Sequence, residues 1–108
     1  MLKYNWKKLA TIFLEAKKRY NLSYLYEVLE VFLYDVEVFE LFIREGADLK
    51  DTKAARDWVD NKMESTDFED IQIEVIDALY NANFYRKKLE EIKNALTSAG
   101  KTQETPEN

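Results

Sequence analysis

The chain has no cysteine and no histidine, and its 108 residues include only two glycines and one proline. The lack of cysteine excludes disulfides, thiolate catalysis and zinc–cysteine sites. The lack of histidine removes the usual general base near neutral pH and the commonest transition-metal ligand. A β-sandwich or barrel needs a turn about every ten residues, and here the residues that mark such turns are scarce. We therefore predict an all-α protein.

Uninterrupted apolar runs are also missing. The most apolar stretch, residues 22–43, has the length of a membrane span but contains five carboxylates, each of which is costly inside a bilayer. The apolar residues near the amino terminus are interrupted by Glu15, too early for a secretory signal. We expect no membrane partner and a cytoplasmic protein, which the absence of cysteine also allows.

The composition is that of a folded domain, with 46% hydrophobic, 34% charged and 14% aromatic residues. Apolar periodicity continues to about Leu96, and the residues after it are rich in Thr, Glu, Gly and Pro. This pattern predicts one helical domain over residues 1–97 and a disordered, flexible tail over residues 98–108.

Within that domain, apolar residues recur at spacings of three and four in four stretches, which predicts a compact bundle of about four helices. The stretches are residues 5–20, 24–45, 52–63 and 67–96, the third being short. Gly46 has the right place to end the second helix as its C′ residue. The triplet Asn81-Ala82-Asn83 is the weakest point of the fourth, because Asn is a modest helix former.

The second and fourth predicted helices each carry more apolar surface than one buried face requires. The surplus stripes comprise Val31, Val38 and Phe42 on the second helix and Ile73, Ile76, Tyr80 and Phe84 on the fourth. The second helix is either central and packed on two sides within one chain, or it meets another chain. Two surplus stripes in a small domain are hard to bury internally, so they indicate a homodimer or another protein partner.

Charge is segregated along the sequence. Residues 1–20 carry six cations and one anion, whereas residues 64–81 carry six anions and no cation. The acidic candidates are Glu27, Glu30, Glu37 and Glu40 on the second predicted helix and Asp70, Glu74 and Asp77 on the fourth. They either pair with the basic first helix or form an acidic surface for a basic partner. They lack the alternating ligands and central glycine of a calcium loop, so we predict no metal site.

Asp35 lies between the two apolar stripes of the second predicted helix, and we expect it to be a buried carboxylate. A buried carboxylate must be paired or its pKa rises. The expected partner is Lys, Arg or Tyr from the first helix. A catalytic role would need a second group, and the pattern places none beside it.

Nucleic-acid binding is not indicated. Residues 52–56 have the small-residue composition of a first helix in a helix-turn-helix, but the helix that follows opens with carboxylates that repel phosphate. The isoelectric point of about 4.8 points the same way.

The sequence thus favours a non-enzymatic protein–protein interaction module that self-associates through the stripes of the second and fourth helices. One alternative is an acidic immunity or inhibitor protein that binds a basic enzyme or toxin. A further alternative is an enzyme that uses only carboxylates and lysines. We predict no cofactor, no small-molecule ligand and no nucleic acid.

Overall fold

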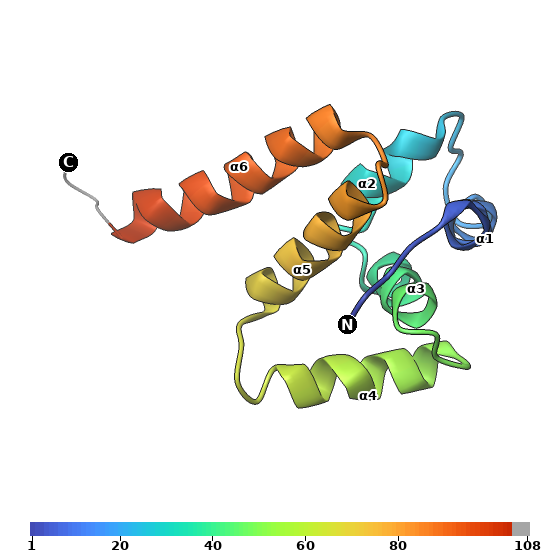
Figure 1. The fold of residues 1–108 in the computed structure, drawn as a ribbon, viewed down its shortest axis with the longest axis horizontal. Helices are drawn as coiled ribbons and strands as arrows, with labels where there is room; N and C mark the ends of the chain where they lie inside the picture. Colours follow the sequence, from blue (N-terminus) through green and yellow to red (C-terminus); the bar gives the residue numbers. More distant parts are fainter. Residues whose placement is uncertain (105–108) are drawn as a thin grey trace.

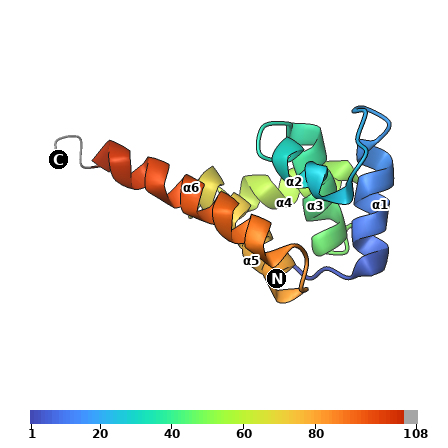
Figure 2. The ribbon, with the colours of Figure 1, turned by 90° about the horizontal axis from the view of Figure 1, so that it is seen from above.

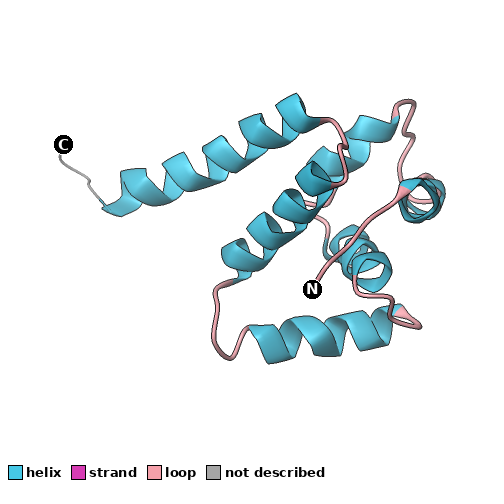
Figure 3. Ribbon diagram, viewed as in Figure 1, coloured by secondary structure: helices cyan, strands magenta, loops and turns pink. Residues whose placement is uncertain are grey.

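The computed structural model describes the backbone of residues 1–104 and the side chains of residues 1–98. The helices are α1 (Trp6–Ala16), α2 (Val28–Val31), α3 (Val36–Gly46), α4 (Thr52–Lys62), α5 (Phe68–Asn81) and α6 (Arg86–Glu104), with a 3₁₀ turn η1 (Leu25–Glu27) before α2. No strand occurs among residues 1–104, which confirms the all-α prediction (Figure 3). Six helices replace the four predicted because two of the predicted helices are each divided.

The helix starts follow the local sequence. Asn5 caps α1 by accepting a hydrogen bond from the backbone N–H of Lys8 (2.9 Å). Asp51 caps α4 in the same way, through the N–H of Ala54 (2.8 Å). A capping side chain satisfies one of the amide donors that a helix leaves free at its start. These two starts lie within a residue of the predicted ones.

The predicted helix 24–45 is wrong as one continuous element, because it is interrupted between α2 and α3. Asp35 has an extended backbone there, and its side chain accepts hydrogen bonds from the N–H groups of Glu37 (2.9 Å) and Val38 (3.1 Å). An Asp that captures nearby amides competes with the helix and starts a new one. The break leaves the Leu33 carbonyl without a helical partner, and the buried Gln72 of α5 donates to it (3.2 Å).

The predicted helix 67–96 is likewise two helices, and it divides at the triplet identified as its weakest point. Asn83 takes the left-handed conformation (φ 62°), and its N–H donates to the Tyr80 carbonyl (3.0 Å). The next N–H, that of Phe84, donates to the Leu79 carbonyl (3.2 Å). These two bonds form a Schellman ending, with Asn at the position usually held by glycine. The buried Phe84 ring then anchors the turn before α6 begins.

Helix α3 is the centre of the fold. It packs against α1, α4 and α5, whereas α6 packs against α5 (Figures 1 and 2). Three phenylalanines surround this centre at no more than 2% exposure, and we call Phe32, Phe39 and Phe42 the phenylalanine cluster. The core continues from Leu2 to Ile92 as one contiguous group of buried side chains. A central helix needs apolar residues on more than one side, which explains the surplus on the predicted second helix.

Gly46 has a different role from the predicted C′ residue. It is the last residue of α3, and its φ is not positive. A Cβ atom at this position would lie 2.6 Å from the Tyr4 hydroxyl oxygen. Tyr4 occupies that space to donate to the Phe42 carbonyl (2.6 Å), and the N–H of Lys3 donates to the Gly46 carbonyl (2.9 Å). Glycine is therefore required for close packing of the N-terminal segment on α3.

The two ends of the chain differ from the predicted boundaries. Helix α1 ends at Ala16, and turns follow where helix was predicted to Tyr20. Helix α6 continues to Glu104, past Ser98, where the flexible tail was predicted to begin. The rest of that predicted tail, 105–108, lies outside the described residues. The C-terminal half of α6 extends beyond the body formed by the other helices (Figures 1 and 2).

Candidate functional site

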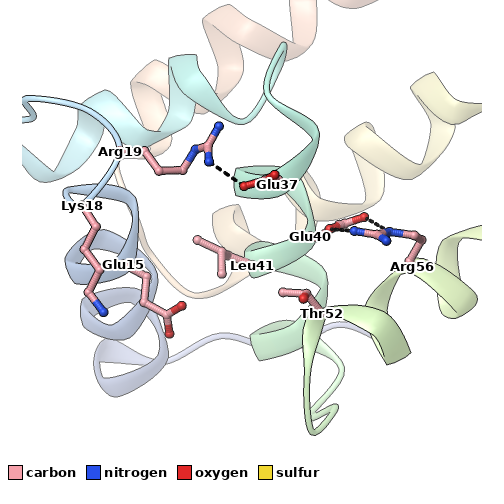
Figure 4. A pocket seen from close by; sticks show the side chains of 8 residues that line it. All are labelled: Glu15, Lys18, Arg19, Glu37, Glu40, Leu41, Thr52 and Arg56. Carbon is pink, nitrogen blue, oxygen red and sulfur yellow. Dashed lines mark hydrogen bonds and ion pairs between the residues drawn. The ribbon is translucent and has the colours of Figure 1, made fainter.

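A charged cleft lies between α1, α3 and the start of α4 (Figure 4). Its volume is about 430 Å³. The lining residues are Glu15, Lys18, Arg19, Glu37, Glu40, Leu41, Thr52 and Arg56. Three cations and three carboxylates face it, so its charged side chains balance.

The arginines of the charged cleft are engaged by carboxylates of the same chain. Arg56 holds the buried carboxylate of Glu40 with two hydrogen bonds (2.7 and 3.0 Å), and this contact raises the pKa of the guanidinium. Arg19 Nη1 lies 2.6 Å from Glu37 Oε1. A bidentate pair is strong and directional, and breaking it to admit a ligand would leave Glu40 buried without a counter-charge. The ion pairs of the cleft therefore stabilise the packing of α1, α3 and α4.

The predicted acidic faces are used within the chain in the same manner. Each of their members has an intramolecular partner: Glu27 with the N–H groups of Ser23 and Tyr24, Glu30 with Lys88, Glu37 with Arg19, Glu40 with Arg56, Asp70 with the N–H of Asp67, Glu74 with Lys62, and Asp77 with Lys93. The cations come from several elements, so internal complementarity is spread over the fold and is not confined to the first helix. The charges of these residues are therefore balanced within the chain, although the side chains of Glu30, Glu37 and Asp77 remain more than half exposed.

Asp35 is half-buried and not fully buried as predicted, but it has the partners expected for it. The Tyr20 hydroxyl donates to its carboxylate, and Arg19 Nη2 lies 3.4 Å from the same oxygen. The hydrogen bond from Tyr20 is the main cause that holds the pKa of Asp35 below its usual range. Both partners follow α1 directly in the chain, so the predicted pairing with the first helical region is confirmed. An ionised, capping carboxylate with all these contacts is a structural group.

Most of the predicted interface residues lie in the hydrophobic core of the single chain. Val31, Val38, Phe42, Ile76 and Phe84 are buried within one chain, and Ile73 and Tyr80 are half-buried. The alternative in which the second helix is packed on two sides within the monomer therefore accounts for its surplus stripe. In this conformation the five buried residues cannot form a contact surface for another chain, which corrects their assignment as interface residues.

A second surface was missed by the sequence reasoning. Tyr24, Tyr26 and Tyr85 form an aromatic group at the junction of η1 and the turn before α6. The rings of Tyr24 and Tyr26 are stacked with centroids 5.7 Å apart, and Tyr85 meets Tyr26 edge-on at 5.8 Å. They remain 60%, 37% and 45% exposed. Two lysines at the start of α6, Lys87 and Lys88, border the rings, and we call these five residues the tyrosine surface.

The α6 side of the tyrosine surface has two lysines, one of them paired with Glu30, and one carboxylate, Glu91. Lys88 lies 5.9 Å above the Tyr26 ring and 2.9 Å from Glu30, and the bond to Glu30 raises its pKa. Lys87 is exposed and has no ion-pair partner among the described side chains. Tyr26, Tyr85, the two lysines and Glu91 line an open cavity of about 500 Å³. Apolar ring faces beside ammonium groups suit a segment with both apolar and acidic groups.

Tyr85 has an uncommon backbone. Its φ is 43°, in the left-handed region that a bulky residue rarely enters. The conformation costs on the order of 1 kcal/mol for a residue with a Cβ. The sequence signal that could have located this surface was the Asn-rich triplet, since a helix that ends there exposes the next residues in a turn.

Compared with protein-family models, with curated protein sequences and with solved structures, the chain matches none. Over the described residues, no group of three acidic side chains is arranged to hold a metal ion. No helix in the same part of the chain is long and apolar enough to cross a membrane.

Proposed function

We propose that this chain is a non-enzymatic protein–protein interaction module that self-associates, and that its contact residues are those of the tyrosine surface. The observation that carries the proposal is the exposed group of three tyrosines, in which Tyr24 and Tyr85 each pack on Tyr26 and the backbone of Tyr85 is held in the left-handed region. Strained backbone at an exposed aromatic is often retained for binding and not for stability.

Tyrosine is well suited to such a contact. It offers a large rigid ring at little conformational cost and a hydroxyl that can hydrogen-bond across an interface. Tyr and Arg dominate the residues that contribute most to protein–protein binding. The three rings already pack on one another, so little freedom would be lost when a partner covers them.

The experiment is site-specific photo-crosslinking in cells that produce the protein. A photoreactive phenylalanine analogue is placed at Tyr85, and in a matched control at Tyr34, which is 73% exposed and lies outside the tyrosine surface. We expect protein adducts at position 85 and not at position 34, with the mass of each adduct identifying whether the partner is a second copy.

The opposite result is equally clear. Equal labelling at both positions, or no protein adduct at position 85, would contradict the proposal. Circular dichroism of both variants serves to show that the helical fold is retained, because each position is exposed and should tolerate the substitution.

A further inference from the structure

We infer that the tyrosine surface binds the acidic segment 103–107 of a second copy of the chain, with the two α6 helices side by side and antiparallel. This inference rests on the proposed function and names the occupant of its surface. It follows from the charge order of α6, from the length of that helix and from the aromatic groups at its start.

The first turn of α6 is unfavourable for its own helix dipole. The helix opens with Arg86, Lys87 and Lys88 and has no acidic residue in its first turn, and cations are unfavourable at a helix start. At the other end of the helix Lys101 precedes Glu104, and the segment Gln103–Glu107 has two carboxylates and no cation. In an antiparallel pair, the carboxylates of this segment lie beside the cations at the start of the other copy's α6.

The contact cannot be made within one chain. Helix α6 has 19 residues, and at 1.5 Å per residue it is about 28 Å long. Glu104 is its last residue, and Glu107 follows only three residues later, a reach of about 10 Å even when fully extended. The end of the α6 backbone is therefore distant from Lys87 of the same chain.

A second copy solves this problem in a symmetric way. When two α6 helices of equal length lie antiparallel, the end of each lies beside the start of the other, so both tyrosine surfaces are filled at once. Such an isologous pair closes on itself and does not continue into a filament. The backbone of the C-terminal half of α6 extends past the body of its own chain (Figure 1).

The segment also fits the tyrosine surface chemically. The open cavity of about 500 Å³ beside Tyr26 and Tyr85 has the size of a site for a few residues. Lys87, which lacks an ion-pair partner among the described side chains, is the natural contact for a carboxylate of the other copy.

The test is a charge exchange measured by sedimentation of the full chain at low ionic strength. We expect the wild type to approach twice its 12.8-kDa mass as concentration rises. Lys87→Glu alone, and Glu104→Lys with Glu107→Lys, should each weaken association about tenfold, since a pair at each of two symmetric sites turns repulsive. The combined variant with all three changes should recover association.

The matched control is Lys50→Glu, which makes the same change of charge at an exposed lysine of the α3–α4 loop. It should associate like the wild type. A wild type that stays monomeric, a Lys87→Glu variant that associates normally, or a combined variant that is not rescued would each overturn the inference. An adduct from position 85 to a second copy, found together with a Lys87→Glu variant that associates normally, would overturn the inference while leaving the proposed function intact.

Discussion

The molecule contains two aromatic groups of similar geometry and opposite use. In the phenylalanine cluster, ring centroids lie 4.9 and 6.3 Å apart and the rings are enclosed by α3 and its neighbours. In the tyrosine surface, the spacings are 5.7 and 5.8 Å, yet all three rings reach solvent. Ring spacing alone therefore does not distinguish a buried aromatic group from an exposed one. The difference lies in burial and in the hydroxyl, which phenylalanine lacks.

The largest expected effect on stability comes from removing a ring of the phenylalanine cluster. Phe42→Ala should cost about 3–5 kcal/mol of unfolding free energy, because it deletes a fully buried ring and leaves a cavity. Denaturant unfolding measures the effect. Tyr34→Ala, at an exposed ring, is the control and should change stability by less than about 0.5 kcal/mol. A Phe42→Ala protein of normal stability but altered mass would restore Phe42 to an interface role.

A smaller loss should follow when the space beside the phenylalanine cluster is filled. Gly46→Ala places a methyl group 2.6 Å from the Tyr4 hydroxyl oxygen, and we expect a cost of about 1–3 kcal/mol. In a Tyr4→Ala background the same change should be nearly neutral, because the clash is gone and Ala favours helix. Thermal unfolding of the four proteins tests this coupling. Additive effects would show that the close approach of Tyr4 to Gly46 is not the cause.

The contribution of Asp35, which lies between core and surface, should make the unfolding free energy depend on pH. Its folded pKa is lowered, chiefly by the hydrogen bond from Tyr20, so the carboxylate stabilises the fold fully above its unfolded pKa of about 4. That stabilisation is lost as the pH falls through the folded pKa.

Asp35→Asn keeps an acceptor for the start of α3 but removes the charge, and at pH 7 it should cost about 1 kcal/mol. The stability difference from wild type should shrink on acidification below pH ~4. Urea unfolding at several pH values measures it. A difference that is constant with pH would mean that the charge of Asp35 contributes nothing.

The smallest effect, of opposite sign, is expected at the tyrosine surface. Tyr85→Asn should leave stability unchanged or raise it by up to about 1 kcal/mol, because Asn tolerates a positive φ better than Tyr does. Tyr85→Asn should also abolish association while the protein remains folded. Phe42→Ala cannot provide this test, because it destabilises the fold itself. Asn83→Ala, at φ 62°, is the counterpart and should cost about 1 kcal/mol. A clear destabilisation by Tyr85→Asn would mean that its ring serves packing against Phe84.

Much of the fold follows from the sequence alone. Spacings of three and four predict helices, and the near absence of glycine and proline excludes a sheet with many turns. The capping residues Asn5 and Asp51 begin their helices because a side-chain oxygen beside free amides is a local interaction. The Asn81-Ala82-Asn83 triplet shows its weakness for a local reason as well, since Asn accepts the left-handed ending. Asp35 was correctly expected to be paired, because a carboxylate among apolar neighbours has few alternatives.

Only the tertiary structure decided which apolar residues are buried within the chain and which charged residues pair with one another. The stripe of Val31, Val38 and Phe42 has the same periodicity whether it faces α1, α5 or a second chain, because periodicity records a buried face and not what buries it. The acidic residues were expected either to pair with the basic first helix or to form an open surface, yet several of their cations come from other elements, as Lys88 does for Glu30. The tyrosine surface joins residues about sixty positions apart, from Tyr24 to Tyr85. Contacts of that kind depend on how the helices pack, and packing is not a property of any one segment.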